Sequence, residues 1–328
     1  MMTFGLIALI AGAASALMFA SVVSGALISL VLVYLAPLPL MLAAIAWGPL
    51  CGALGGLVAT LVIAGALSPP LALGYGLAFA LPAWWLGHLA MLGRPLMLGS
   101  PLASGNAGPD AASPHVEWYP LGRILLWIAA LATLLTAGSL YSLGSDAPAI
   151  SDAMRRGFAK ILSLVSETTI AESDPRVGLM VAVIPVLVAA SQMATLTLNL
   201  WLAAKVAAVS GRLHRPWPDL SGTSLPPMTL VALCVALAFS FFSGMAGILA
   251  VVVTTVLMMA YALVGLAVLH TITRGLANRG IWLAAAYAIV FVFSVSLILL
   301  TALGLADAVF GFRERFLRNR QPPPLPTT

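Results

Sequence analysis

Long apolar runs fill most of this chain and are separated by short polar connections. About 20 helical residues cross the roughly 30 Å hydrocarbon layer of a bilayer, and a helix satisfies its own backbone hydrogen bonds there. The pattern therefore predicts membrane-spanning helices at residues 4–33, 37–67, 71–92, 121–143, 177–208, 228–243, 246–270 and 281–305.

The number of spans depends on the second run, which is long and contains the pair Gly48-Pro49 near its middle. Proline inside a helix removes a hydrogen bond and breaks a straight axis, so we expect eight or nine spans. No segment alternates in polarity as the strands of a transmembrane barrel do. The fold class is therefore predicted as all-α, a polytopic transmembrane helical bundle over residues 1–312.

The polar connections are of different kinds. Residues 93–120 contain Pro and Gly without apolar periodicity and predict a polar loop, and residues 209–227 predict a basic loop. Residues 313–328 form a basic, Pro-rich tail that we expect to be disordered from Gln321 onward.

Residues 144–176 have the pattern of an amphipathic helix, with Ser151 as its expected cap. The apolar positions recur every three or four residues: Ile150, Met154, Phe158, Ile161, Leu162 and Val165. Such a helix lies on the membrane surface or across the mouth of the bundle. It acts as a connector between spans or as a substrate lid.

Composition supports the membrane interpretation. The chain is 62% hydrophobic and 8% charged, with a mean hydropathy of +1.09, whereas soluble domains carry about 25% charged residues. The net charge of +5 does not predict a nucleic-acid partner, because the basic residues are scattered over short loops and a tail. The lipid bilayer and its anionic headgroups explain them.

Orientation depends on Lys and Arg in the short loops, and the two span counts conflict. Nine spans with a cytoplasmic amino end place Arg94, Arg212, Arg215, Arg274 and Arg279 inside but send the four-Arg tail outside. Eight spans keep the tail inside and reverse most of the others. We favour a cytoplasmic carboxyl end because the tail is the densest basic cluster.

Small residues recur every four positions in the first two runs, at Ala8, Gly12, Ala16, Ala20 and Ser24, and at Gly48, Gly52 and Gly56. This spacing makes a smooth groove that lets another helix approach closely. The partner helix belongs either to this chain or to another protein.

Polar residues inside spans suggest a ligand site. Gln192, Thr195 and Asn199 share one face of the 177–208 helix because their spacing is three and then four. This face is predicted to bind a small molecule at membrane depth. The alternative is that the same groups form hydrogen bonds with neighbouring helices.

Charged and titratable groups near span ends are His270, Asp307 and Arg313, which we regard as functional candidates. The chain has no phosphate-binding Gly-x-x-x-x-Gly-Lys-Ser/Thr loop and no His-Glu-x-x-His pair. The turn Phe242-Ser243-Gly244 lacks the Gly that precedes a catalytic serine. We therefore expect neither an enzyme, nor a metal site, nor a cofactor.

Two stretches of the sequence resemble known families. The segment from Ala36-Pro-Leu-Pro-Leu through Trp47-Gly-Pro-Leu-Cys-Gly-Ala-Leu-Gly-Gly resembles S components of energy-coupling-factor transporters. The later half resembles the uncharacterised YybS-like bacterial membrane proteins. The matching residues there are Asn199-Leu-Trp-Leu-Ala, Gly265-Leu-Ala-Val-Leu-His270 and Gly304-Leu-Ala-Asp307-Ala-Val-Phe-Gly-Phe-Arg313.

The resemblance implies an S-component-like bundle in the bacterial inner membrane. S components bind vitamins or similar small metabolites and depend on a coupling membrane subunit and ATPases. Their first helix docks the coupling subunit, and the matching surface here is Ala8, Gly12, Ala16 and Ala20. The expected function is thus a small-molecule-binding or transport subunit. The rival hypothesis is a non-catalytic membrane scaffold that recruits cell-envelope or signalling proteins.

Overall fold

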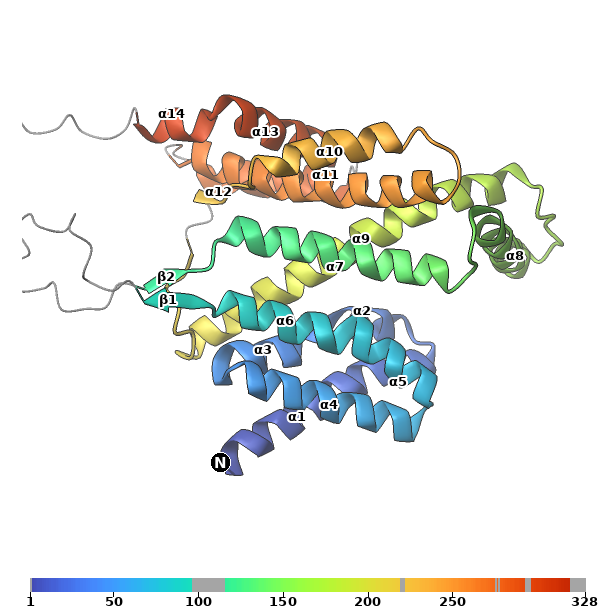
Figure 1. The fold of residues 1–328 in the computed structure, drawn as a ribbon, viewed down its shortest axis with the longest axis horizontal. Coiled ribbons are helices and arrows are strands. Elements are labelled where there is room, and N and C mark those ends of the chain that lie inside the picture. The colour runs from blue at the N-terminus through green and yellow to red at the C-terminus, as the bar shows by residue number, and fades with distance from the viewer. Residues whose placement is uncertain are drawn as a thin grey trace, which may run out of the picture. The chain divides into compact units, whose positions relative to one another are not determined.

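The computed structural model describes residues 2–95, 116–218, 222–274, 276, 278–292 and 296–318 (Figure 1). The described chain is helical apart from one pair of short strands, which confirms the all-α prediction. Six of its helical segments are long and apolar enough to cross a membrane, and three shorter apolar helices accompany them. The contacts divide the chain into unit 1, residues 1–124 and 195–218, and unit 2, residues 125–194 and 219–328.

Unit 1 begins with α1 (Met2–Ala20), a 3₁₀ turn (Ser21–Ser24), α2 (Leu27–Leu35), α3 (Pro37–Trp47) and α4 (Pro49–Ala66). The prediction of one span over 4–33 is wrong, because Gly25 adopts a φ of 67° and ends the first helical segment. Glycine lacks the Cβ that makes this conformation costly. Gly48 has a φ of 100°, and the predicted break at Gly48-Pro49 is confirmed.

Unit 1 continues with α5 (Pro69–Tyr75), a π-helical turn (Gly76–Ala80) and α6 (Leu81–Ala90). Next come the antiparallel strands β1 (Gly93–Pro95) and β2 (Val116–Trp118), in which Arg94 pairs with Glu117. The side chains of these two residues form an exposed ion pair at 2.9 Å. The predicted loop thus has paired ends, and the rest of it, residues 96–115, lies outside the described residues.

The small residues of α1 pack against α4. A Cβ built on Gly12 would collide with the carbonyl oxygen of Gly55, and one built on Gly55 would lie 3.2 Å from the carbonyl oxygen of Ala8. Three residues before Gly55 on α4, a Cβ on Gly52 would lie 2.6 Å from the Cβ of Ala44 on α3. These positions let three backbones approach one another closely.

Two members of the predicted small-residue set do not pack in this way, since a Cβ on Gly48 would meet nothing within 4 Å and Ser24 is exposed. Ala8 and Ala16 are buried, at 3% and 1% exposure, and Ala20 is half-buried. Gly56 is buried against Ala80, whose Cβ would lie 3.2 Å from an added Cβ. The surface that would dock a coupling subunit is therefore largely covered by helices of the same unit.

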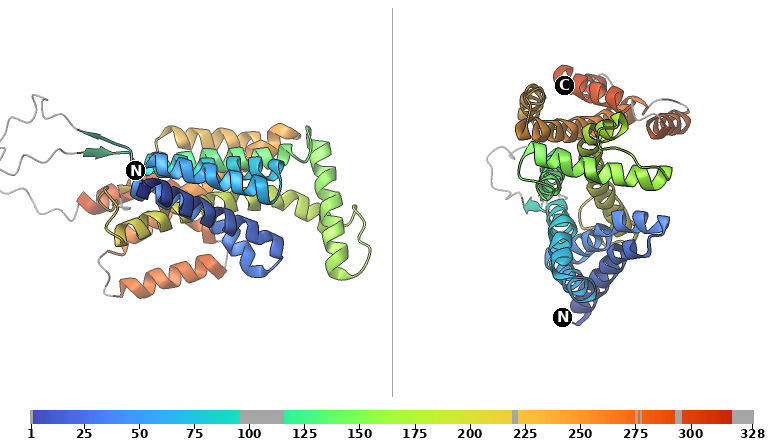
Figure 2. Two further views of the ribbon diagram at one scale, coloured as in Figure 1. Left: turned by 90° about the horizontal axis from the view of Figure 1, so that it is seen from below. Right: turned by 90° about the vertical axis from the view of Figure 1, so that its right-hand side faces the viewer.

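Unit 2 contains most of α7 (Leu121–Tyr141), all of α8 (Ala147–Ser166) and the first part of α9 (Pro175–Val209). Helix α8 lies within residues 144–176, where the sequence predicts an amphipathic helix, and it runs across the direction of α7 and α11 (Figure 2). Its cap is Asp146, which accepts the N–H of Ala149 at 2.8 Å. The prediction of Ser151 as cap is wrong, because Ser151 lies inside the helix.

Asp174 precedes α9 and accepts the backbone N–H of Arg176 at 2.8 Å and its guanidinium at 3.0 and 2.8 Å. These hydrogen bonds hold the pKa of the Asp174 carboxyl below its usual range. The carboxylate thereby satisfies a free donor at the start of the helix.

The last part of unit 2 consists of α10 (Met228–Phe239), α11 (Met245–Ile272), α12 (Arg279–Val292), α13 (Ser296–Phe310) and α14 (Phe312–Arg318). The predicted span at 281–305 is wrong, since α12 and α13 are separate helices. Residues 312–318 form α14 at the start of the predicted basic tail, and residues 319–328, which include the part expected to be disordered from Gln321 onward, lie outside the described residues.

Helices α11 and α13 run parallel in close contact. The Thr301 hydroxyl donates to the Met258 carbonyl at 3.1 Å, and three residues farther along both helices a Cβ on Gly304 would collide with the Tyr261 carbonyl. A Cβ on Gly265 would likewise collide with the Leu300 carbonyl. Because the two helices are parallel, their carboxyl ends lie at the same end of unit 2.

Candidate functional site

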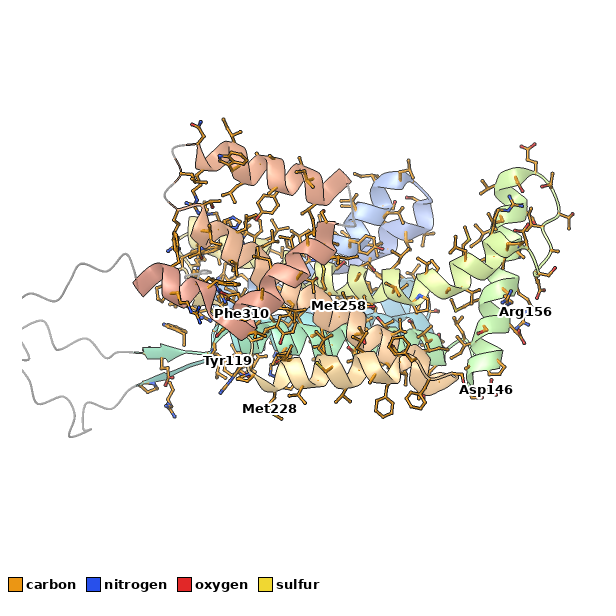
Figure 3. All side chains as sticks on the ribbon, turned by 90° about the horizontal axis from the view of Figure 1, so that it is seen from above. Tyr119, Asp146, Arg156, Met228, Met258 and Phe310 are labelled. Carbon is orange, nitrogen blue, oxygen red and sulfur yellow. The ribbon has the colours of Figure 1, made fainter. Side chains whose placement is uncertain are left out.

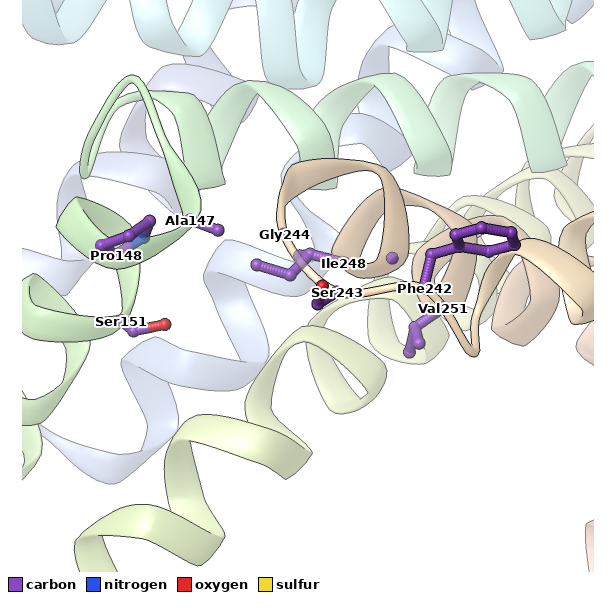
Figure 4. A pocket seen from close by; sticks show the side chains of 9 residues that line it. Ala147, Pro148, Ser151, Phe242, Ser243, Gly244, Ile248 and Val251 are labelled. Atoms are coloured by element: carbon purple, nitrogen blue, oxygen red, sulfur yellow. The ribbon is translucent and has the colours of Figure 1, made fainter.

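An open groove lies at one end of unit 2, between the first turn of α8 and the turn that joins α10 to α11 (Figure 4). Its volume is about 500 Å³. The residues that line it are Ala147, Pro148, Ser151, Phe242, Ser243, Gly244, Gly247, Ile248 and Val251.

Local sequence explains how this groove forms. Gly244 has a φ of 82° and precedes α11, and Gly247 lies so near the Phe242 carbonyl that an added Cβ would collide with it. Two glycines therefore make the tight turn that carries Phe242 and Ser243 to the rim. Pro148 stands in the first turn of α8, where its missing N–H costs nothing.

The groove is chemically simple. Its lining is mostly carbon, the side-chain hydroxyls are those of Ser151 and Ser243, and no lining residue is titratable. Such a surface suits an apolar or amphiphilic molecule whose polar group accepts or donates a hydrogen bond. Sequence reasoning considered Phe242-Ser243-Gly244 only as a failed catalytic turn and missed its place in a groove. The available signal was a Ser-Gly pair between two apolar runs.

Two of the charged candidates meet in a buried ion pair at the other end of unit 2. The Arg313 Nε donates to Asp307 Oδ2 at 2.7 Å, and the Arg313 backbone N–H donates to Asp307 Oδ1 at 2.9 Å. The Arg313 Nη1 also donates to the Thr223 carbonyl at 2.8 Å. The side chains are 9% and 5% exposed. Gly311, with a φ of 62°, reverses the chain between the two partners.

His270 lies on α11 and faces α12 rather than a second charged group. Its Nδ1 is 2.9 Å from the Leu266 carbonyl, which can only accept, so Nδ1 carries the proton. The Tyr287 hydroxyl lies 3.4 Å from Nε2, and the two rings meet edge to face at 5.8 Å. Both ring nitrogens are thus engaged with neighbouring groups.

The three residues of the predicted polar face on α9 differ in how deeply they are buried. Asn199 is fully buried, and its Nδ2 donates to the carbonyls of Tyr34 and Thr195, each at 2.8 Å. Gln192 and Thr195 are half-buried. None of the three lines the groove described above. The Asn199 contact with Tyr34 joins α9 to α2, which is the role of a helix-packing amide.

The predicted basic loop packs on tryptophans of unit 1. Arg212 lies over the ring of Trp47 at 4.7 Å, and Arg215 lies over Trp118 at 5.9 Å. Arg215 also donates to the Ala90 carbonyl at 3.1 Å, and burial lowers the pKa of its guanidinium. Cations over aromatic faces are stabilised by the ring quadrupole, so these contacts fix the loop.

Comparison with known proteins gives one family. Residues 122–308 match the family described as predicted membrane protein (DUF2232). Searches of curated proteins and of solved structures found no significant match. The matched range contains the groove, the α11–α13 crossing and Asp307, and it ends before Arg313.

Proposed function

We propose that this chain, which belongs to the predicted membrane protein family DUF2232, acts as a small-molecule-binding or transport subunit of the bacterial inner membrane. The observation that carries the proposal is the groove at the α8 end of unit 2. Its mostly carbon lining and two serine hydroxyls favour a small amphiphilic metabolite. The resemblance of residues 36–56 to S components supports the same class of function.

The proposal separates binding from energy supply. The chain binds the ligand without catalysing a reaction, and a coupling subunit with its own ATPases supplies the energy. The close packing of Ala8 and Gly12 on α4 and the burial of Ala16 leave the first helix poorly suited to dock that subunit. We therefore expect a coupling partner to contact another surface.

The proposal is tested by mass spectrometry of small molecules that co-purify with the protein in mild detergent. The groove variant is Val251→Trp, which fills the space beside α8. The matched control is Val253→Trp, because Val253 is also half-buried on α11 and does not line the groove. We expect a bound amphiphile with the wild type and the control, and its loss from Val251→Trp. Equal amounts of every small molecule in both variants would contradict the proposal.

A second candidate function is a membrane scaffold that recruits envelope or signalling proteins. It is favoured by the buried Asp307–Arg313 pair, which attaches α14 to unit 2 and presents Arg315 on an ordered, exposed surface. Crosslinking in native membranes from a photoreactive residue at Arg315 tests this candidate. A stable protein adduct supports the scaffold, whereas adducts with lipid alone count against it.

A further inference from the structure

The amphipathic helix α8 has one apolar stripe that is covered along half of its length. Ile150, Met154, Ile161 and Val165 follow one another at spacings of four, seven and four, so they share a single face. Ile150 and Met154 are 1% and 6% exposed, whereas Ile161 and Val165 are 53% and 79% exposed. The stripe is therefore continuous, but unit 2 covers only its first half.

The position of α8 explains this division. Its first turn lies against the α10–α11 turn, at the end of unit 2 where α11 begins. From there α8 runs across the direction of the spanning helices, and the left view of Figure 2 shows its far part extending beyond them. The covered half of the stripe faces the ends of these helices. The uncovered half of the stripe faces the same way. Where no helix end lies below it, this direction points into the bilayer that surrounds the spanning helices.

The face of α8 opposite the apolar stripe is charged. Asp152, Arg156 and Lys160 follow at intervals of four, all are exposed, and they lie on the face opposite Met154 and Val165. Asp146 and Arg156 mark the start and the middle of the helix in Figure 3. With the caps Asp146 and Glu167, the helix carries charges of both signs, and this charged face suits the polar headgroup region of a membrane surface.

Other large apolar side chains of this part of unit 2 are exposed as well. Leu164 is 72% exposed on α8, and Leu179 is 66% exposed in the first turns of α9, a candidate span. Helix α9 begins close to α8, because the Arg155 guanidinium donates to the Glu172 carbonyl at 3.3 Å and lies 4.0 Å from a Cβ built on Gly178. The exposed apolar half of α8 therefore lies near the start of a membrane-spanning helix, and this position favours lipid rather than a second protein as the occupant.

We propose that the carboxyl-terminal half of α8 is an in-plane membrane anchor, with Ile161, Leu164 and Val165 inserted among the acyl chains of the bilayer that the spanning helices cross. Its amino-terminal half instead covers the end of unit 2 and forms one wall of the groove. The two halves thus couple the groove to the lipid surface.

The test uses the full chain with Cys51→Ala and Cys234→Ala, which removes both native cysteines. An environment-sensitive fluorophore is attached at Val165→Cys or, as the matched control, at Arg156→Cys on the opposite face. The proteins are reconstituted in nanodiscs of phosphatidylethanolamine and phosphatidylglycerol, with and without lipids that carry a nitroxide quencher in the upper acyl chain. Elution volume and circular dichroism confirm that both labelled proteins are folded.

We expect the probe at Val165 to emit at shorter wavelength and to be quenched several-fold more strongly by the nitroxide lipids than the probe at Arg156. Water-like emission at Val165, equal to that at Arg156, would overturn the proposal. Blue-shifted emission without quenching by lipid would also overturn it, because protein rather than lipid would then cover the site. Leu164→Cys repeats the measurement from a neighbouring position and is expected to match Val165.

Discussion

Removing the Arg313 side chain tests whether the buried ion pair holds the end of unit 2 together. The substitution Arg313→Met keeps much of the apolar stem but leaves the Asp307 carboxylate, 5% exposed, with only the backbone N–H of residue 313 as a donor among the contacts described above. It also removes the bond from Nη1 to the Thr223 carbonyl. Removing one partner of a buried ion pair costs about 3–5 kcal/mol.

The corresponding change in melting temperature is measurable. A folded unit of about 150–250 residues loses about 2–4 °C in Tm per kcal/mol, which gives a decrease of ~6–20 °C for Arg313→Met. The assay is thermal denaturation in mild detergent, followed by size-exclusion chromatography of the remaining folded protein. Arg315→Met on the same helix is the control, because Arg315 is exposed and exposed charges contribute about 0–1 kcal/mol.

A double variant distinguishes the ion pair from general packing. Asp307→Leu combined with Arg313→Met removes both buried charges and is expected to be more stable than Arg313→Met alone. Equal Tm values for Arg313→Met and Arg315→Met would refute the reasoning. A double variant whose loss of Tm equals the sum of the losses of Asp307→Leu and Arg313→Met would also refute it, since the two charges would then be energetically uncoupled.

Three further predictions concern the helix contacts and the orientation of unit 2. Gly304→Ala is expected to lower the Tm measured in detergent, because the new Cβ collides with the Tyr261 carbonyl and separates α11 from α13. The control Gly138→Ala, whose new Cβ meets nothing within 4 Å, is expected to leave the Tm unchanged or to raise it. A smaller loss of Tm for Gly304→Ala than for Gly138→Ala would contradict the close crossing of α11 and α13. Asn199→Leu is expected to cost about 0.6–2 kcal/mol in SDS unfolding, the range for hydrogen bonds between membrane helices, and no loss would show that the contact with Tyr34 contributes nothing. Single cysteines that replace Arg279 or Arg315 are expected to react with a membrane-impermeant maleimide added to one side of the membrane, and a cysteine that replaces Glu167 with the same reagent added to the other side. The reason is that α8 and α14 lie at opposite ends of α11. Labelling of all three cysteines from one side would contradict the described fold.

The part of the orientation conflict that lies within unit 2, between Arg274 and Arg279 and the basic tail, is removed because α12 and α13 are two helices. A single span at 281–305 puts Arg274 and the tail on opposite sides of the membrane. Because α13 runs parallel to α11, the connection after α11 and helix α14 lie at one end of unit 2. The lysine and arginine rule then favours that end, including Arg279 and Arg313, as the cytoplasmic one.

Several elements were predictable because their signals are local. Pro49 removes a helical hydrogen bond through its own covalent structure, and the alternation of apolar and charged positions in α8 needs no tertiary information. The end of α1 was not predictable in this way. Gly25 lies inside an apolar run like many helical glycines, and its left-handed conformation depends on how α1 and α2 pack.

At the candidate sites, the residues were predictable from the sequence, but their contacts were not. Asp307 and Arg313 were identified as charges near a span end, but their pairing depends on the reversal at Gly311 and on the approach of Thr223. Asn199 was identified on a polar face, and only the neighbouring α2 determines that its amide binds the Tyr34 carbonyl. The groove was missed because it is made by two turns about 100 residues apart in sequence.

The amino-acid sequence was sufficient to predict that this protein lies in a membrane as a helical bundle and where most of its helices are. Hydropathy is sufficient for this, since every unpaired backbone group in lipid is costly and each apolar helix satisfies its own. The packing of the helices was needed to show which small residues meet, such as Gly265 and Gly304, and which half of α8 is covered. Lipid and a neighbouring helix are both apolar, so the hydropathy pattern cannot distinguish a face that contacts one from a face that contacts the other.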